Sequence, residues 1–325
     1  MKIVNLTPHP GRLFSDHIQA VSDLTDVRAV DLHQQTEAKI MEEVADADII
    51  VPDYLSKTPI TENIAKAAKN VKLIQTVSAG FEYIDLEICR RSNIKVSNLA
   101  GGNAPVVAEH TIMLLLALLR NLIPINNRTH QAEWPDKVKD PTQGLYGLIG
   151  RVVGLLGMGQ IARAVAERLA PFRTRTIYYS RSKLSSEDEK RYSATYADFK
   201  DLLKKADAVC IHLPLSEETR NIIGASEIAL MKNTAIIINM GRGGLVDEEA
   251  LARAIREKRI RGAGLDVFSE EPIARNNPLI GLDHVILTPH CGGSAPESFQ
   301  NMLNLSVENM IRAYKGEEPY YVVNR

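Results

Sequence analysis

The sequence is poor in cysteine, has no long hydrophobic run and carries no excess of charge of either sign. Cysteine occurs only at Cys89, Cys210 and Cys291, without a CxxC pair, which argues against a disulfide framework and a thiolate zinc site and fits a reducing compartment. The longest apolar run, Ile112–Leu119, is far below the roughly 20 residues that span a bilayer. With 39 Lys and Arg against 40 Asp and Glu, the chain lacks the basic surface that nucleic acids require. We therefore expect neither a membrane nor a nucleic acid as a partner.

The amino terminus shows no cationic segment followed by an apolar one, so we expect no secretory signal and a cytoplasmic protein. The rest of the composition is ordinary for a globular protein. The 325 residues, of which 45% are hydrophobic and 24% charged, allow about two domains.

Short β-branched runs alternate with longer amphipathic stretches, which is typical of parallel sheets covered by helices. Five runs in the first hundred residues predict a small α/β unit, and a second series of six predicts a full doubly wound sheet. The first strands expected are Lys2–Leu6, Val27–Asp31, Asp48–Val51, Lys72–Thr76 and Ile94–Ser97. The second are Val152–Leu156, Thr176–Tyr179, Ala208–His212, Ala235–Asn239, Gly262–Val267 and Val285–Thr288.

Three further segments lie outside these two series. Ala104–Asn121 reads as a helix too apolar all round to lie on a surface, so we expect it to be buried at a domain or subunit junction. Ile123–Tyr146 is polar and rich in proline, which predicts an irregular arm. The tail from Ala295 predicts another amphipathic helix.

One glycine-rich segment, Gly157–Ala162 (GMGQIA), follows a predicted strand and opens a predicted helix. Gly157 permits a tight turn, Gly159 lets backbone amides approach a pyrophosphate, and Ala162 allows the helix to pack closely on the strand. An ordinary turn between a strand and a helix is the alternative. The strand before and the helix after favour dinucleotide binding.

The end of the next strand indicates which dinucleotide is bound. NAD binding needs an acid about 20 residues on, to hold the ribose 2′-hydroxyl. The sequence has Ser180, Arg181, Ser182 and Lys183 at this place, and these side chains can bind a 2′-phosphate. We therefore expect NADP(H) to be preferred, with NAD(H) possible; two solvated basic residues on a loop are the alternative.

Five separated motifs together resemble the D-isomer-specific 2-hydroxyacid dehydrogenases, most of all the glyoxylate and hydroxypyruvate reductase group. They are Ala108-Glu109-His110, His212-Leu213-Pro214-Leu215 followed by Thr219, Met240–Asp247 (MGRGGLVD), Gly264–Pro272 (GLDVFSEEP) and Thr288-Pro289-His290. The resemblance implies two doubly wound α/β domains with parallel sheets. A Rossmann cofactor domain, residues 101–291, is inserted into a flavodoxin-like substrate domain, residues 1–100 and 292–325, and the active site lies in the cleft.

Reduction of a 2-oxo acid needs a hydride donor, a proton donor and a cation for the carboxylate. Histidine suits proton donation because its pKa lies near neutrality, and a neighbouring carboxylate favours the protonated ring. The resemblance assigns this pair to His290 and to Glu271, the acid directly before the proline, rather than to Glu270. It assigns the cation to Arg242, whose planar fork can engage a carboxylate. Without the resemblance, His290 reads as a loop histidine and Arg242 as a surface arginine.

The resemblance also implies binding residues by position. The turn Ser78-Ala79-Gly80 resembles the loop whose N–H groups bind the substrate carboxylate, although the family has glycine at its first position and a small aliphatic residue in place of Phe81. Asp266 resembles the residue that receives the nicotinamide carboxamide. For the cofactor we expect Gly157, Gly159, Gln160, Ile161, Ser180, Arg181, Ser182, His212, Pro214, Thr219, Met240 and Asp266. For the substrate we expect Tyr54, Ala79, Gly80, Arg242 and His290.

Three other residues are weaker candidates for catalysis. His212 resembles a position at the adenine site, and His110 lies in the apolar helix, where a structural role is expected. Cys291 points away from His290 on an extended segment, which favours a structural thiol. No His, Asp and Glu cluster has metal-ligand spacing, so no metal is expected.

The function that these features predict is hydride transfer between NADP(H) and a small 2-oxo or D-2-hydroxy acid. Residues 51–56 and 79–83, expected at the far end of the substrate, contain no Lys or Arg, and no extra regulatory domain is expected after Arg325. An unphosphorylated acid, glyoxylate or hydroxypyruvate first, is therefore expected. An NAD-dependent D-lactate or phosphoglycerate dehydrogenase is the alternative, and an NAD(H)-sensing corepressor a remote one. The apolar helix and the arm resemble the family's dimerisation region, which predicts a homodimer.

Overall fold

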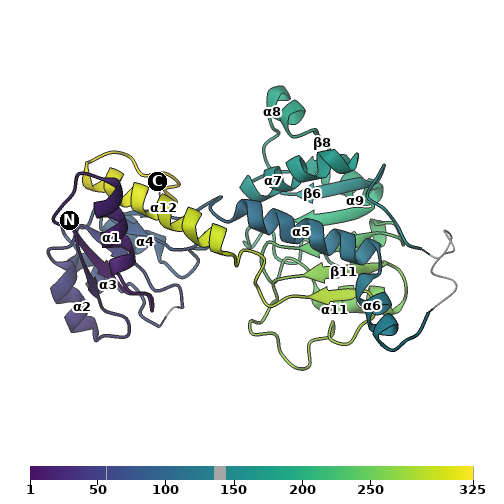
Figure 1. Cartoon of the computed structure of the whole chain (residues 1–325), viewed down its shortest axis with the longest axis horizontal. Coiled ribbons are helices and arrows are strands. Elements are labelled where there is room, and N and C mark those ends of the chain that lie inside the picture. The colour runs from purple at the N-terminus through teal and green to yellow at the C-terminus, as the bar shows by residue number, and fades with distance from the viewer. Residues whose placement is uncertain (56, 135–143, 325) are drawn as a thin grey trace. The chain divides into compact units, whose positions relative to one another are not determined.

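The computed structural model describes residues 1–55, 57–134 and 144–324. These residues form two compact units, Met1–Asn103 with Ala295–Arg325 and Ala104–Ser294. The expected domain boundaries, after residues 100 and 291, lie three residues before these. Each unit is an α/β domain with a parallel sheet (Figure 1), so the predicted fold class is confirmed.

The sheet of the first unit has the strand order β2-β1-β3-β4-β5. Helices α1 and α12 pack on one face, through Ile18 and Met310, and α2, α3 and α4 cover the other. In this order a ligand-binding crevice is expected at the carboxyl ends of β1 and β3, where the chain changes direction across the sheet. The elements are β1 Lys2–Asn5, α1 Arg12–Val21, β2 Arg28–Asp31, α2 Glu37–Val44, β3 Ile49–Val51, α3 Glu62–Ala67, β4 Leu73–Gln75, α4 Leu86–Arg91, β5 Lys95–Ser97 and α12 Pro296–Tyr314.

The sheet of the second unit has the order β12-β11-β10-β9-β6-β7-β8. Helices α5 and α7 pack on one face and α9, α10 and α11 on the other. The crevice of such a sheet lies at the carboxyl ends of β6 and β9. The elements are α5 Ala104–Leu119, α6 Leu122–His130, β6 Val152–Leu156, α7 Gln160–Leu169, the 3₁₀ turn Ala170–Phe172, β7 Arg175–Tyr179, α8 Ser186–Arg191, β8 Ala194–Tyr196, α9 Phe199–Lys205, β9 Ala208–Ile211, α10 Ala225–Leu230, β10 Ile236–Asn239, α11 Glu248–Arg256, β11 Gly262–Leu265 and β12 Val285–Leu287.

Two local features differ from the sequence prediction. The second sheet has a seventh strand, β8, which pairs with β7 at the sheet edge and is too short to show an alternating pattern. The arm expected to be irregular begins with α6. Its Pro124 lies in the first helical turn, where a missing N–H costs no hydrogen bond. Residues 135–143 of the expected arm and Ser56 of the expected substrate wall lie outside the described residues.

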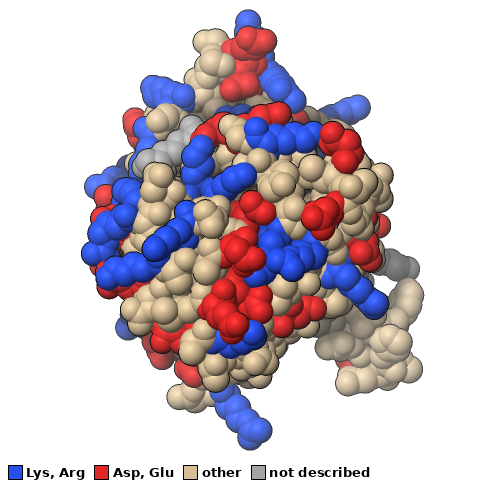
Figure 2. Space-filling view, turned by 90° about the vertical axis from the view of Figure 1, so that its left-hand side faces the viewer, with Lys and Arg blue, Asp and Glu red and all other residues tan. Residues whose placement is uncertain are grey.

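The sequence analysis expects neither a nucleic acid nor a membrane as a partner, and the surface charge and the length of the helices are relevant to these two expectations. On the face shown in Figure 2, basic side chains gather toward the left of the view and acidic ones lie nearer its centre. No single helix among the described residues is long and apolar enough to cross a membrane, although α5 and α6 pass that test together with a bend of 64° between them. Most of α5 is buried in the core of the second unit.

Candidate active site

The glycine turn of the second unit connects β6 to α7. Gly157 has φ +91°, and a side chain there would come within 2.8 Å of the carbonyl oxygen of His212. Gly159 caps α7, and a side chain added there would meet nothing within 4 Å, so its amide borders open space at the helix N-terminus. Ala162 is fully buried, while Gln160 is exposed and Ile161 half-buried. This arrangement fits the pyrophosphate of a dinucleotide.

The loop after β7 carries the residues expected to select the cofactor. The Ser180 hydroxyl donates to the carbonyl oxygen of Ser182 at 2.6 Å, which closes a tight turn. Arg181 and Ser182 are exposed, and the Lys183 amino group lies 4.3 Å from the centre of the Tyr196 ring. The loop therefore presents a guanidinium and no carboxylate at the end of β7.

The expected adenine-site segment follows β9. Thr219 shapes it, because its hydroxyl donates to the carbonyl of Pro214 at 2.7 Å and accepts from the Ser216 amide at 2.8 Å. Both ring nitrogens of His212 are buried and make no hydrogen bond within the described part of the chain. Burial lowers the pKa of His212 to about 3, so the folded protein holds this ring neutral.

His212 should therefore make stability depend on pH. The unfolded chain binds a proton here below about 6.5 and the folded chain only near 3, so stability falls as the pH falls between these values, by up to about 1.4 kcal/mol per pH unit. Urea unfolding at pH 7.5 and 5.5 should show the wild type losing about 1.4 kcal/mol more than His212→Gln over this interval. The exposed His130→Gln should behave as the wild type, and equal losses in all three proteins would contradict the assignment.

Arg242 follows β10 at the carboxyl edge of the sheet, in a turn that Asn239 holds. The buried Asn239 side chain donates to the carbonyl of Arg242 at 3.0 Å and accepts from the Gly241 amide at 3.1 Å. The Arg242 guanidinium donates to the carbonyl of Gly241 at 2.9 Å and is half-buried. Side chains at Gly241 or Gly243 would collide with the carbonyls of Leu213 or Phe268. The sequence analysis missed Asn239 because an asparagine ending a strand carries no signal of its own.

His290 and Glu271 are in contact in the same unit. The Nδ1 atom of His290 lies 2.6 Å from a carboxylate oxygen of Glu271, whose other oxygen accepts from the Phe268 amide at 3.0 Å. The contact is made by Glu271, the acid that the sequence analysis chose over the neighbouring Glu270, and its role as the partner of a proton donor stays a prediction. The Nε2 atom of His290 has no hydrogen bond among the described residues, and half of the side chain is exposed. Glu271 thus orients the ring and leaves Nε2 to exchange a proton with a ligand.

Asp266 is buried and its carboxylate is already occupied by protein donors. It accepts from the Thr288 hydroxyl at 2.5 Å, the Cys291 amide at 3.0 Å and the Gly292 amide at 2.8 Å. Met240, another expected cofactor contact, is also buried, with its side chain against Gly292. These contacts give Asp266 a structural place in the site; its expected contact with the carboxamide stays a prediction.

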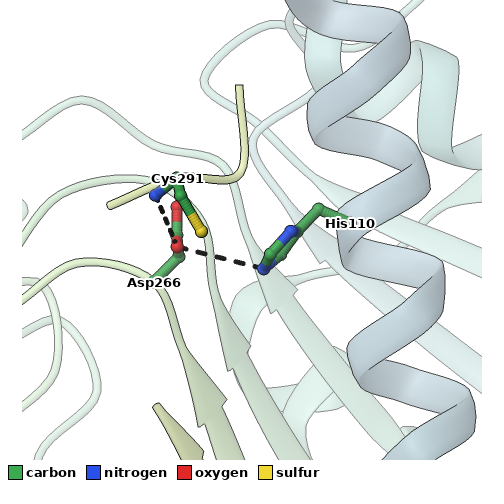
Figure 3. A group of neighbouring side chains, drawn as sticks. All are labelled: His110, Asp266 and Cys291. Carbon is green, nitrogen blue, oxygen red and sulfur yellow. Dashed lines mark hydrogen bonds and ion pairs between the residues drawn. The ribbon is translucent and has the colours of Figure 1, made fainter. Parts of the chain in front are cut away.

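His110, Asp266 and Cys291 gather around one point (Figure 3), with potential metal-ligand atoms within 4.8 Å of one another. The chemistry of the three does not suit a metal. Asp266 already accepts three hydrogen bonds, and burial raises the pKa of the Cys291 thiol, which disfavours the thiolate. We therefore interpret the group as a hydrogen-bond network.

The expected substrate residues of the first unit lie at the carboxyl ends of β3 and β4. The carbonyls of Ser78, Ala79 and Gly80 all accept hydrogen bonds from within the unit. The N–H groups of Ala79 and Gly80 donate none among the described residues. The turn is thus held by its carbonyls and has two amides available for an anion.

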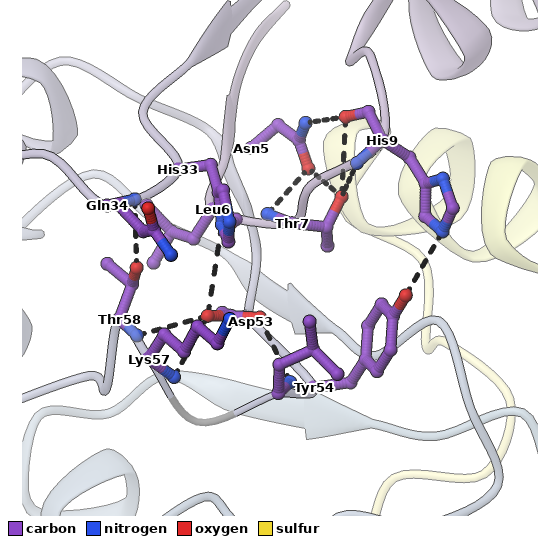
Figure 4. A network of polar contacts seen from close by, with 11 residues as sticks. Asn5, Leu6, Thr7, His9, His33, Gln34, Asp53, Tyr54, Lys57 and Thr58 are labelled. Carbon is purple, nitrogen blue, oxygen red and sulfur yellow. Dashed lines mark hydrogen bonds and ion pairs between the residues drawn. The ribbon is translucent and has the colours of Figure 1, made fainter.

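Tyr54 lies in a loop that the buried Asp53 shapes by accepting from the amides of Leu55, Lys57 and Thr58. Its hydroxyl, expected to face the substrate, is 3.2 Å from Nε2 of His9, and the two rings stack (Figure 4). His9 follows β1, so the pair stands where a crevice is expected in this sheet. The sequence analysis missed His9 because the contact joins residues 45 positions apart.

The comparisons with known proteins agree with this geometry. Residues 112–292 match the model of the D-isomer specific 2-hydroxyacid dehydrogenase NAD binding domain. The chain is 35% identical to glyoxylate reductase of Aeropyrum pernix, over 96% of this chain and 94% of that protein. It is 36% identical to D-3-phosphoglycerate dehydrogenase of Methanocaldococcus jannaschii, over 95% of this chain and 58% of that one.

A solved structure extends the likeness to the fold. The glyoxylate reductase of Paecilomyes thermophila superposes with a TM-score of 0.82 at 29% identity, covering 98% of this chain and 97% of that one. The second unit is therefore an NAD(P)-binding domain, and the chain belongs to the family of D-isomer-specific 2-hydroxyacid dehydrogenases.

Proposed function

We propose that the protein reduces small unphosphorylated 2-oxo acids to D-2-hydroxy acids with NADPH, with glyoxylate or hydroxypyruvate as the best substrate. The observation that carries the proposal is the contact of His290 with Glu271 at 2.6 Å, in the same unit as the glycine turn and Arg242. The relatives named glyoxylate reductase support the choice of substrate.

The roles of the residues follow from their chemistry. A bound NADPH would supply the hydride for the carbonyl carbon. His290 donates the Nε2 proton to the carbonyl oxygen, and Glu271 keeps the ring in place by accepting from Nδ1. Arg242 binds the carboxylate and carbonyl of the oxo acid. In the first unit, the two available N–H groups of Ala79 and Gly80 are suited to binding an anion such as a carboxylate.

A panel of oxo acids tests the substrate class. We expect kcat/KM with NADPH to be highest for glyoxylate or hydroxypyruvate, because the described residues of 51–55 and 79–83 offer no Lys or Arg to a phosphate. A higher kcat/KM on 3-phosphohydroxypyruvate than on every unphosphorylated acid would instead support a phosphoglycerate dehydrogenase.

We also propose a homodimer, which a sedimentation mass near 36.0 kDa at micromolar concentration would contradict.

Arg181 should determine the preference for NADPH. The exposed guanidinium at the end of β7 can pair with a 2′-phosphate, and no acid stands there to bind a ribose hydroxyl. We expect Arg181→Asp to lower kcat/KM for NADPH about 10-fold or more, the scale of one charge-assisted contact, and to improve NADH relative to NADPH. Lys190→Asp, an equal charge change on α8, should leave the ratio unchanged. A wild-type kcat/KM with NADH that equals or exceeds the value with NADPH would refute the assignment.

A further inference from the structure

The proton donor proposed above has an unusual backbone conformation. His290 follows β12 with φ +51°, in the left-handed region that residues other than glycine rarely adopt. Its amide donates to the carbonyl of Thr288 at 3.0 Å, which makes the turn tight. Such a conformation costs about 1–3 kcal/mol and persists only where neighbouring contacts enforce it.

One buried carboxylate supplies these contacts on both sides of His290. Asp266 accepts from the Thr288 hydroxyl, two residues before, and from the amides of Cys291 and Gly292, which follow directly. Gly292 is required for this approach, because a side chain there would come within 2.8 Å of the Asp266 carboxylate. The loop is therefore fixed to the end of β11 on either side of the histidine.

His110 of α5 extends this network through Thr288. Its Nε2 atom lies 3.1 Å from the Thr288 hydroxyl oxygen, and the two residues are 178 positions apart in the chain. A hydroxyl has one proton, and Thr288 gives that proton to Asp266. The hydrogen bond with His110 therefore requires that Nε2 carries a proton and donates it. The donor of each hydrogen bond is then fixed: His110 donates to Thr288, and Thr288 donates to Asp266.

We propose that His110 is a positioning residue for His290: by donating to Thr288 it holds the Thr288–Asp266 bond and, with it, the left-handed backbone that presents the His290 ring. The proposal rests on the role of His290 as proton donor given under the proposed function. It gives a role to a histidine whose side chain contacts Thr288 and Asp266 rather than His290 itself.

Two matched pairs of variants test the proposal. His110→Leu removes the donor, and His110→Gln keeps an N–H group at a similar reach. Thr288→Val removes the hydroxyl, and Thr288→Ser keeps it. We expect His110→Leu to lower kcat about fivefold and Thr288→Val about tenfold or more, on the scale of one and two lost hydrogen bonds. The KM for NADPH should change less than about twofold, and His110→Gln and Thr288→Ser should recover most of kcat.

The effect must also depend on His290. In a His290→Ala background, His110→Leu should cause no further loss of the residual kcat, because the supported side chain is gone. His17→Leu, on α1 of the first unit, serves as the control in both backgrounds. An unchanged kcat in His110→Leu, or an equal loss in both backgrounds, would overturn the proposal.

A crystal structure of His110→Leu provides a readout that does not need activity. We expect the His290 backbone to leave the left-handed region or its ring to leave Glu271. An unmoved His290 would overturn the proposal even if kcat falls. If the wild type reduces no 2-oxo acid at all, the proposed function fails. The position of His290 in the crystal structure of His110→Leu still decides whether His110 holds His290 in place.

Discussion

Replacing His290 with alanine should lower kcat for glyoxylate reduction at least about 100-fold, the usual scale for the loss of a positioned general acid. The Nε2 atom is the ring position left without a hydrogen bond among the described residues, so its loss removes the proton source without emptying a buried core. Steady-state kinetics with NADPH measures the effect, and fluorescence titration with NADPH verifies that the cofactor still binds.

Two companion variants make this result specific. Glu271→Gln keeps a hydrogen-bond acceptor for Nδ1 but removes its charge, so we expect a smaller loss of kcat than in His290→Ala. His17→Ala, which changes a half-buried histidine on α1 of the first unit, should keep wild-type kinetics. A His290→Ala protein with near-normal kcat would refute His290 as the proton donor.

Replacing Arg242 with alanine should raise the KM for the oxo acid about 30-fold or more, because a charged hydrogen-bond donor to the carboxylate contributes about 2 kcal/mol. Arg242→Lys keeps the charge without the planar fork, so it should recover only part of this loss. Both variants keep the Asn239 contacts of the turn, which use the backbone of Gly241 and Arg242 and not the Arg242 side chain.

The measurement is a pair of saturation curves, one in the oxo acid and one in NADPH. The KM for NADPH should change little, which separates loss of substrate binding from damage to the glycine turn. A wild-type KM for the oxo acid in Arg242→Ala would show that another group holds the carboxylate.

The sequence by itself determined the strands, the glycine turn and the family. All eleven predicted strands overlap an observed strand, seven of them over four or more residues, because β-branched runs and the glycines that end them are local signals. The motif around Gly157 was equally clear, since the turn needs a positive φ that glycine adopts freely. Local propensity failed at β8, which is an edge strand of three residues, and at α6, where Pro124 suggested a break.

Only the tertiary structure decided which side chains meet. The contact of Glu271 with His290 joins residues 19 positions apart, and that of His110 with Thr288 joins α5 to the loop after β12. Asp266 could not be assigned its three donors from sequence, because two of them are backbone amides that any residue carries. Hydrogen bonds of this kind form between segments that only the sheet brings together. The residue types of the proposed catalytic groups were therefore readable in the sequence, whereas the contacts that orient them depend on the fold.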